Sequence, residues 1–239
     1  MPETKSYETV SANVAKVREQ MREAALRAGR DPEDVTLVAA TKVQTSDTIR
    51  NAIRAGITVC GENRVQELTA HLEDNAYEGA RVHFIGHLQT NKVKSVIDKT
   101  VLIHSIDSIK LSDTIDFEAR KKGIQVDGLL EVNVAGEESK FGFLPEELLP
   151  LLERLRQYRN LKIRGLMTVA PMVDDAEQNR AVFRRLRELS IDIKLKNTDN
   201  VTMNILSMGM TGDYHVAIEE GATLIRVGTG IFGMREIGE

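Results

Sequence analysis

Lys42 is the residue whose place in the chain points most directly to chemistry. It ends the apolar run VTLVAATK, residues 35–42, a pattern typical of a buried β-strand that carries an amine to its C-terminal end. Burying an ammonium without a partner is costly, and desolvation turns a lysine into a nucleophile that forms Schiff bases with carbonyl compounds. The alternative is a lysine that marks the strand end and points to water, the commoner case for this residue type.

Two loops near the C-terminus have the composition of an anion site. The run SMGMTGD spans residues 207–213, and the run GTGIFG begins at Gly228. Glycine lets the backbone approach a ligand closely, and N–H groups at a following helix start attract anions. Ser207, Thr211 and Thr229 can add hydroxyl donors. Each loop alone has an ordinary turn composition, and the two together predict a phosphate-binding site.

Arg226 is the third candidate for chemistry. In the strand pattern LIRVG, residues 224–228, side chains alternate, so Arg226 shares the face of Leu224 and Gly228. An arginine facing a barrel interior keeps its charge and needs an acceptor, either Glu131 or a ligand atom. An amine, a phosphate site and this arginine suit pyridoxal 5′-phosphate, which has an aldehyde, a phosphate arm and a ring nitrogen.

The elements that must position these residues alternate between short apolar runs and amphipathic helical patterns. Eight such units predict an α/β fold of the (β/α)8 TIM-barrel type, whose site lies at the C-terminal strand ends. A doubly wound sheet would show a glycine fingerprint after its first strand, and AATKVQ has none. The predicted strands are 35–41, 58–62, 82–86, 102–107, 128–134, 162–169, 203–208 and 224–228.

The segments outside these units complete the predicted layout. Residues 6–29 form an extra N-terminal helix, with a valine and methionine stripe expected to pack on the outside of the barrel. Residues 191–202 are expected to form a loop or an excursion before the seventh strand. No linker or repeat interrupts the chain, so we expect a single domain over 1–239.

Composition excludes several classes of protein. The chain has a net charge of −4 and no basic stripe with interleaved aromatics, so nucleic acid is not an expected partner. No apolar run is long enough for a membrane span, and the N-terminus is no secretory signal. Cys60 is the one cysteine, which fits a reducing, cytoplasmic location. The five histidines have no metal-site spacing, so no metal is expected, and His83 and His104 are expected to line the barrel as satisfied interior residues.

Several motifs, in order along nearly the whole chain, resemble the YggS/PROSC family of pyridoxal-phosphate homeostasis proteins. This family is structurally related to the N-terminal barrel of alanine racemase, so the resemblance implies an alanine racemase N-terminal-domain-like fold. The motifs are TK (41–42), GENRVQE (61–67), HFIGHLQTNK (83–92), HSIDS (104–108), LEVNVAGEESKFG (130–142), GLMTVAP (165–171), LSMGM (206–210) and IRVGTGIFG (225–233).

The resemblance implies a role for each matched position. Lys42 takes the place of the lysine that forms the internal aldimine, and Asn63 that of the asparagine beside the cofactor. Arg226 matches an arginine facing the pyridine nitrogen, which leaves the ring a poor electron sink and disfavours carbanion chemistry. The positions matched to the phosphate and its loop are Ser207, Met208, Gly209, Gly228 and Thr229. The chain departs from the family where Val82 and Arg64 replace common aromatic residues.

Three functions compete. The first, implied by the resemblance, is a non-catalytic carrier for pyridoxal phosphate homeostasis, serving apoenzymes that depend on this cofactor. The second is a cofactor-dependent amino-acid racemase or related enzyme, which needs acid/base groups on both faces of the substrate. The third is an aldolase using Lys42 with a phosphorylated sugar, in which Arg226 has no clear role. The racemase's second, tyrosine-bearing and dimer-forming domain has no counterpart in this sequence, so we expect no strong catalysis and favour a monomer.

Overall fold

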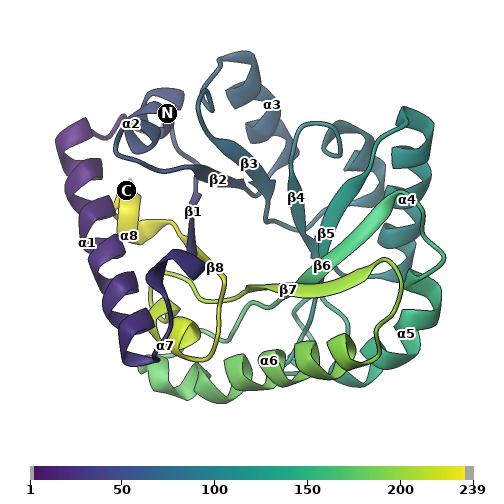
Figure 1. Cartoon of the computed structure of the whole chain (residues 1–239). Coiled ribbons are helices and arrows are strands. Elements are labelled where there is room, and N and C mark those ends of the chain that lie inside the picture. Colours follow the sequence, from purple (N-terminus) through teal and green to yellow (C-terminus); the bar gives the residue numbers. More distant parts are fainter. Residues whose placement is uncertain (1–2, 235–239) are drawn as a thin grey trace.

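The computed structural model describes residues 3–234, which form a closed barrel of eight parallel strands in chain order (Figure 1). All eight predicted strands are present, within a few residues of the expected bounds, so the (β/α)8 prediction is confirmed. The strands are β1 (Thr36–Ala40), β2 (Val59–Glu62), β3 (Arg81–Phe84), β4 (Leu102–Ile106), β5 (Val126–Glu131), β6 (Leu161–Met167), β7 (Val201–Ser207) and β8 (Leu224–Val227).

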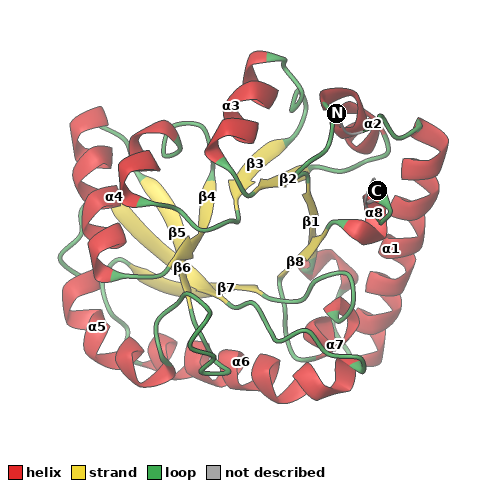
Figure 2. Ribbon diagram, turned by 180° about the vertical axis from the view of Figure 1, so that it is seen from behind, coloured by secondary structure: helices red, strands yellow, loops and turns green. Residues whose placement is uncertain are grey.

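Helices surround the barrel on its outside (Figure 2). The β3–β4 connection carries a 3-10 turn, η2 (Thr90–Ser95), where the other connections carry an α-helix. Glycines just beyond α2, α4 and α7, at Gly56, Gly123 and Gly221, have positive φ and end these helices as predicted. The helices are α1 (Tyr7–Arg27), α2 (Ser46–Arg54), α3 (Val65–Glu73), α4 (Ile109–Lys122), α5 (Leu148–Leu155), α6 (Arg180–Leu195), α7 (Tyr214–Glu219) and α8 (Thr229–Phe232).

Helix α1 is the extra N-terminal helix that the sequence predicted. The side chain of Ser6 caps it by accepting from the backbone N–H of Thr9. It contacts α2, α7 and α8, so it closes the outer layer between the first and last units of the barrel (Figure 1). Its buried apolar stripe is Val10, Val14, Val17 and Met21.

The barrel interior has an apolar layer with a polar layer above it. The apolar layer is contributed by alternate residues of six strands: Val38, Val59, Leu102, Leu129, Met167 and Leu224. Because side chains alternate, the same face carries its next residue two positions later, toward the C-terminal strand ends. On three of these strands that residue is polar and buried, namely His104, Glu131 and Arg226, and on β7 the buried Ser207 follows Ile205, which packs against the same layer. The candidate chemistry therefore lies directly above a packed apolar floor.

The expectation of a loop over residues 191–202 was wrong for its first part. Helix α6 continues to Leu195, because Leu186, Leu189 and Ile193 extend one buried stripe at helical spacing. The chain then turns through Asn197 and Asn200, both at positive φ, and β7 begins at once.

None of the helices described here is long and apolar enough to cross a membrane.

Candidate functional site

Closure of the barrel brings the first and last predicted site segments together. Strands β1 and β8 are parallel neighbours, with Val38 beside Arg226 and Ala39 beside Val227. A Cβ built on Gly228 would lie 3.5 Å from the Cβ of Ala40. The turn that follows β1 and the loop that follows β8 therefore meet at the C-terminal mouth of the barrel.

Lys42 lies in a turn just beyond β1, and its side chain is exposed. The interpretation of this residue as a buried amine was therefore wrong, because the strand ends at Ala40 and the chain turns before Lys42 is covered. The next residue, Val43, has φ 63°, in the left-handed region that β-branched residues avoid. The place of the amine at the mouth, rather than its burial, is what suits it to meet a ligand.

Arg226 is buried inside the barrel, as alternation predicted. Its Nη1 donates to Ser207 Oγ, and its Nη2 donates to the carbonyl oxygen of Thr168 at 2.8 Å. Burial lowers the pKa of Arg226 to about 10, an effect that the charges of Glu131 and Asp213 oppose. Among residues 3–234 no carboxylate comes within ion-pair distance of this guanidinium, so the alternative of an internal ion pair with Glu131 is not realised.

A chain of hydrogen bonds crosses the barrel to reach Arg226. His83 Nδ1 lies 2.9 Å from His104 Nε2, and His104 Nδ1 lies 2.9 Å from Ser207 Oγ. Burial lowers the pKa of His83 to about 4 and that of His104 well below its usual value. The two histidines are satisfied interior residues, as expected, and both rings are neutral beside the buried cation.

Glu131 adds a carboxyl group to the same end of the barrel. Glu131 is only 8% exposed. Burial, together with the charge of Asp107, raises the pKa of its carboxyl group to about 7, although the charge of Arg226 opposes this effect. It lines a small cavity of about 170 Å³ with Asn133 and Lys140. Asn133 does not face a ligand with its amide, because that amide closes the loop after β5 by bonding the backbone of Glu137.

The two glycine-rich loops are joined to each other by backbone and hydroxyl contacts. Arg226 N–H donates to the carbonyl of Gly209 at 3.0 Å, and Gly230 N–H donates to Thr211 Oγ1 at 3.2 Å. Gly209 has φ 89°, and a Cβ there would lie 2.6 Å from the Cβ of Ala217. Only glycine fits this position, so the loop after β7 can pack closely against the start of α7.

The predicted phosphate positions differ in what they can offer. The hydroxyl of Ser207 is buried and engaged by Arg226 and His104, while Met208 packs in the core on the helix side of the barrel. Thr229 is exposed as the first residue of α8. A phosphate at this place would meet the hydroxyl of Thr229 and backbone N–H groups, rather than the side chain of Met208.

Asn63 supplies an unmatched acceptor at the end of β2. Its Oδ1 is buried without a hydrogen-bond partner among the described residues, which is rare for a buried polar atom. It lines a hollow of about 480 Å³ that Arg64, Phe84, His87 and Lys92 also border. An exposed amine, an unmatched amide, a buried cation and two glycine-rich loops are the groups that pyridoxal phosphate needs, so the residues present fit this cofactor.

Of the two departures from the family pattern, Arg64 borders the hollow at Asn63, and Val82 lies away from the mouth. The side chain of Arg64 is 73% exposed and pairs weakly with Glu67 at 3.7 Å. Val82 is buried in the core on the helix side of the barrel. Cys60 is buried on that side too, where burial, with a smaller contribution from Glu62, raises the pKa of its thiol to about 12, so it is an inert core residue as expected.

Sequence reasoning missed three residues that surround the Lys42 turn. Glu62, Glu67 and His71 each bond Thr41, Val43 or Gln44, the neighbours of Lys42. The spacing could have identified two of them, because residues 67 and 71 share one face of a helix directly after the GEN motif.

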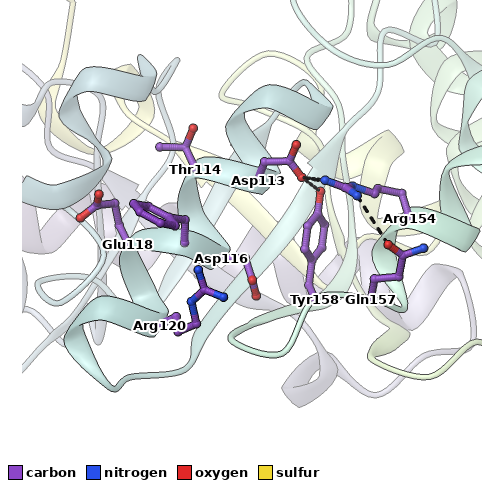
Figure 3. Close-up of a pocket in the computed structure, with 9 residues that line it drawn as sticks. Asp113, Thr114, Asp116, Glu118, Arg120, Arg154, Gln157 and Tyr158 are labelled. Carbon is purple, nitrogen blue, oxygen red and sulfur yellow. Dashed lines mark hydrogen bonds and ion pairs between the residues drawn. The ribbon is translucent and has the colours of Figure 1, made fainter.

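Another surface hollow, of about 660 Å³, lies on the outside of the barrel between α4 and α5 (Figure 3). Asp113 there accepts from Arg154 at 2.7 Å and from the hydroxyl of Tyr158 at 2.7 Å. Asp116 accepts from the backbone N–H groups of residues 159–161. These bonds fasten the two helices and the start of β6, so the groups in this hollow serve the fold.

No cluster of potential metal ligands occurs within residues 3–234.

Comparison with known proteins agrees with this geometry. The family described as "Alanine racemase, N-terminal domain" matches residues 8–236. The pyridoxal phosphate homeostasis protein of Aquifex aeolicus is 45% identical, over 93% of this chain and 97% of its own length. The protein of the same name from Escherichia coli is 33% identical, over 95% and 97%. The chain belongs to the pyridoxal phosphate homeostasis protein family.

Solved structures place the family's fold in a wider group. PipY of Synechococcus elongatus, solved with PLP bound, has a TM-score of 0.82 at 32% identity, covering 94% of this chain and all of its own. An alanine racemase of Clostridium difficile has a TM-score of 0.74 at 12% identity, with 57% of that chain covered. At this identity the likeness to the racemase shows the fold alone. The predicted alanine racemase N-terminal-domain-like barrel is confirmed.

Proposed function

We propose that this chain binds pyridoxal 5′-phosphate at the C-terminal mouth of the barrel and takes part in the homeostasis of this cofactor. The observation that carries the proposal is the pairing of β1 with β8, which brings Lys42 to the same mouth as Arg226 and the loop at Gly228. The unmatched Oδ1 of Asn63 supports it, and so does membership of a family in which PipY has been solved with PLP bound.

Each predicted residue has a part in this proposal. The amine of Lys42 would hold the cofactor aldehyde as a Schiff base, with the loss of one water, and Asn63 would offer its amide beside the ring. Arg226 donates toward the ring nitrogen from the barrel interior, because its cation has no carboxylate partner. The phosphate is held by the loops of Ser207, Met208 and Gly209 and of Gly228 and Thr229, through backbone N–H groups and hydroxyls.

Storage and delivery of the cofactor fit this site better than turnover. Racemisation needs an acid on the face opposite the lysine, and in alanine racemase that acid is a tyrosine. All four tyrosines here are committed elsewhere: Tyr77 to Glu62, Tyr158 to Asp113, Tyr214 to Gln20, and Tyr7 beneath Arg54. We therefore propose a carrier with no strong activity of its own. As expected from the sequence, we propose further that it is cytoplasmic, monomeric and serves apoenzymes.

A racemase or related enzyme remains the second candidate, on one observation. The carboxyl of Glu131 is buried at the same end of the barrel, with a pKa of about 7, which is suitable for proton transfer near neutral pH. Racemisation of common amino acids at ordinary enzyme rates, abolished by Glu131→Gln, would establish this candidate and remove the carrier proposal.

Reduction and mass spectrometry test the proposed function. Protein mixed with the cofactor should gain the visible absorption of a Schiff base, and borohydride should fix the adduct on Lys42. Lys42→Ala should abolish the absorption, whereas Lys140→Ala, which removes a lysine paired with Glu137, should leave it unchanged. A wild-type protein that stays colourless, or an adduct on another lysine, contradicts the proposal.

A further inference from the structure

The residues on either side of Lys42 are each held by a side chain from another element. Thr41 Oγ1 donates to Glu62 Oε1 at 2.6 Å, at the end of β2. The backbone N–H of Val43 donates to Glu67 Oε2 at 2.9 Å, on α3. Both carboxylates therefore act on the turn that carries the lysine, although neither contacts the lysine itself.

A third contact comes from His71, further along α3. Its Nε2 lies 3.1 Å from the carbonyl oxygen of Gln44, and its Nδ1 lies 3.0 Å from Glu62 Oε1. Glu62 and Gln44 both offer acceptors, so a doubly protonated ring donates to both of them, and Nδ1 also lies 3.1 Å from the hydroxyl of Tyr77. Tyr77 also donates to Glu62 Oε1 at 2.7 Å, so one buried carboxylate oxygen joins Thr41, His71 and Tyr77.

The backbone of the turn needs such support. Val43 has φ 63°, and a β-branched residue in the left-handed region is a true outlier. A conformation of this kind persists only where its surroundings over-determine it. The bond from Val43 N–H to Glu67 acts directly on the strained residue, one position after Lys42.

The holding groups all lie outside the barrel. Cys60, on the same face of β2 as Glu62, packs in the core between barrel and helices, whereas Val59 packs in the interior layer. Thr41 is therefore fastened on the helix side of the sheet. This fastening acts one residue before Lys42, whose own side chain stays exposed beyond the end of β1.

We propose that Glu62, Glu67 and His71 are positioning residues for Lys42, holding its turn in the strained conformation that presents the amine to an aldehyde at the mouth. We call these three residues the lysine clamp. The proposal rests on the proposed function, because it assigns to the clamp the rate and strength of Schiff-base formation at Lys42.

Glu67→Ala gives the sharpest test, because it removes one contact at the edge of the clamp and leaves the buried carboxylate of Glu62 in place. We expect Schiff-base formation with pyridoxal phosphate to slow roughly 10- to 100-fold, since misplacing a reacting group by about 1 Å has costs of that order. Glu67→Gln keeps an oxygen that can accept from Val43 N–H and should retain most of the wild-type rate. Glu73→Ala removes an exposed carboxylate from the same helix and should change nothing.

A double variant separates positioning from simple stabilisation. In Glu67→Ala/Val43→Gly the strained residue becomes glycine, which adopts positive φ without support. We expect the rate of Schiff-base formation to recover part of the loss, because the turn no longer needs the bond from Glu67 to hold its conformation. Equal rates in the single and double variants, or a wild-type rate in Glu67→Ala, would overturn the proposal.

Amide hydrogen exchange provides a readout that needs no cofactor. The Val43 amide should exchange slowly in the wild type and in Glu73→Ala, and faster in Glu67→Ala. If the wild type forms no adduct at Lys42, the proposed function fails, and this exchange still shows whether the clamp holds the turn. Unchanged exchange in Glu67→Ala would contradict the clamp whatever the cofactor does.

Discussion

Lys42 and Arg226 lie at the same mouth on neighbouring strands, yet they are held in different ways. Lys42 is exposed, and its turn is fixed from outside the barrel by side chains of other elements, Glu67 and His71 among them. Arg226 is buried and is fixed from inside by neutral groups, the hydroxyl of Ser207 and a carbonyl. A reactive amine must stay accessible, so only its backbone can be held, whereas a recognition cation can be oriented by direct contacts.

Because the surroundings of Lys42 and Arg226 differ, we expect their contributions to stability to change with pH in opposite directions. On the Arg226 side, burial keeps His83 neutral, with a pKa of about 4 in the fold against about 6.5 unfolded. The unfolded chain therefore binds the proton first as the pH falls, and stability is lost between about pH 6.5 and pH 4. On the Lys42 side, burial alone would lower the pKa of His71, but Glu62 raises it above its usual value. That contribution is present at low pH and is lost as the pH rises through the folded pKa.

The largest expected effect is acid destabilisation through His83. Its shift corresponds to about 3 kcal/mol of unfolding free energy lost between pH 7 and pH 4. Urea unfolding of the wild type and His83→Gln over this range measures it, because glutamine does not titrate there. The stability difference between the two proteins should shrink by about that amount on acidification. A difference that stays constant with pH would show that His83 is not held neutral.

The next effect is a gain in stability when the buried cation is removed. Burial of the Arg226 cation without a carboxylate partner costs free energy, as its lowered pKa indicates. Arg226→Met should raise the unfolding free energy at pH 7 by about 1–2 kcal/mol, net of the bonds lost at Ser207 and Thr168. The same variant should weaken cofactor binding at least about tenfold, since it removes a charged donor. A less stable variant with unchanged binding would make Arg226 a structural residue.

The smallest effect is alkaline loosening of the Lys42 turn through His71. As the pH rises and the ring loses its proton, one of its two bonds, to Glu62 or to Gln44, must be lost. Hydrogen exchange of the 41–45 backbone, corrected for its intrinsic pH dependence, should therefore lose protection in the wild type as the pH rises through the folded pKa of His71. In His71→Gln the protection should not vary with pH. Protection that rises with pH would contradict a charged His71.

The fold and the inward face of β8 were predictable because they depend on local patterns. Alternation in LIRVG placed Arg226 inside, and apolar runs separated by helical patterns located all eight strands. Residues 191–202 were misread because the polar groups of KLKNTDN hid the helical stripe that ends at Ile193. The exposure of Lys42 was not predictable either, because it depends on the residue at which the strand ends and the chain turns.

The sequence by itself determined which groups this protein has and in what order: an amine after the first strand, glycine-rich loops after the last two, and an arginine facing inward. The tertiary structure decided what those groups touch. Barrel closure set β1 beside β8, linked His104 on β4 to Ser207 on β7, and brought His71 to the carbonyl of Gln44. These partners are far apart in the chain, and hydrogen bonds depend on distances of a few tenths of an ångström, which periodicity does not encode.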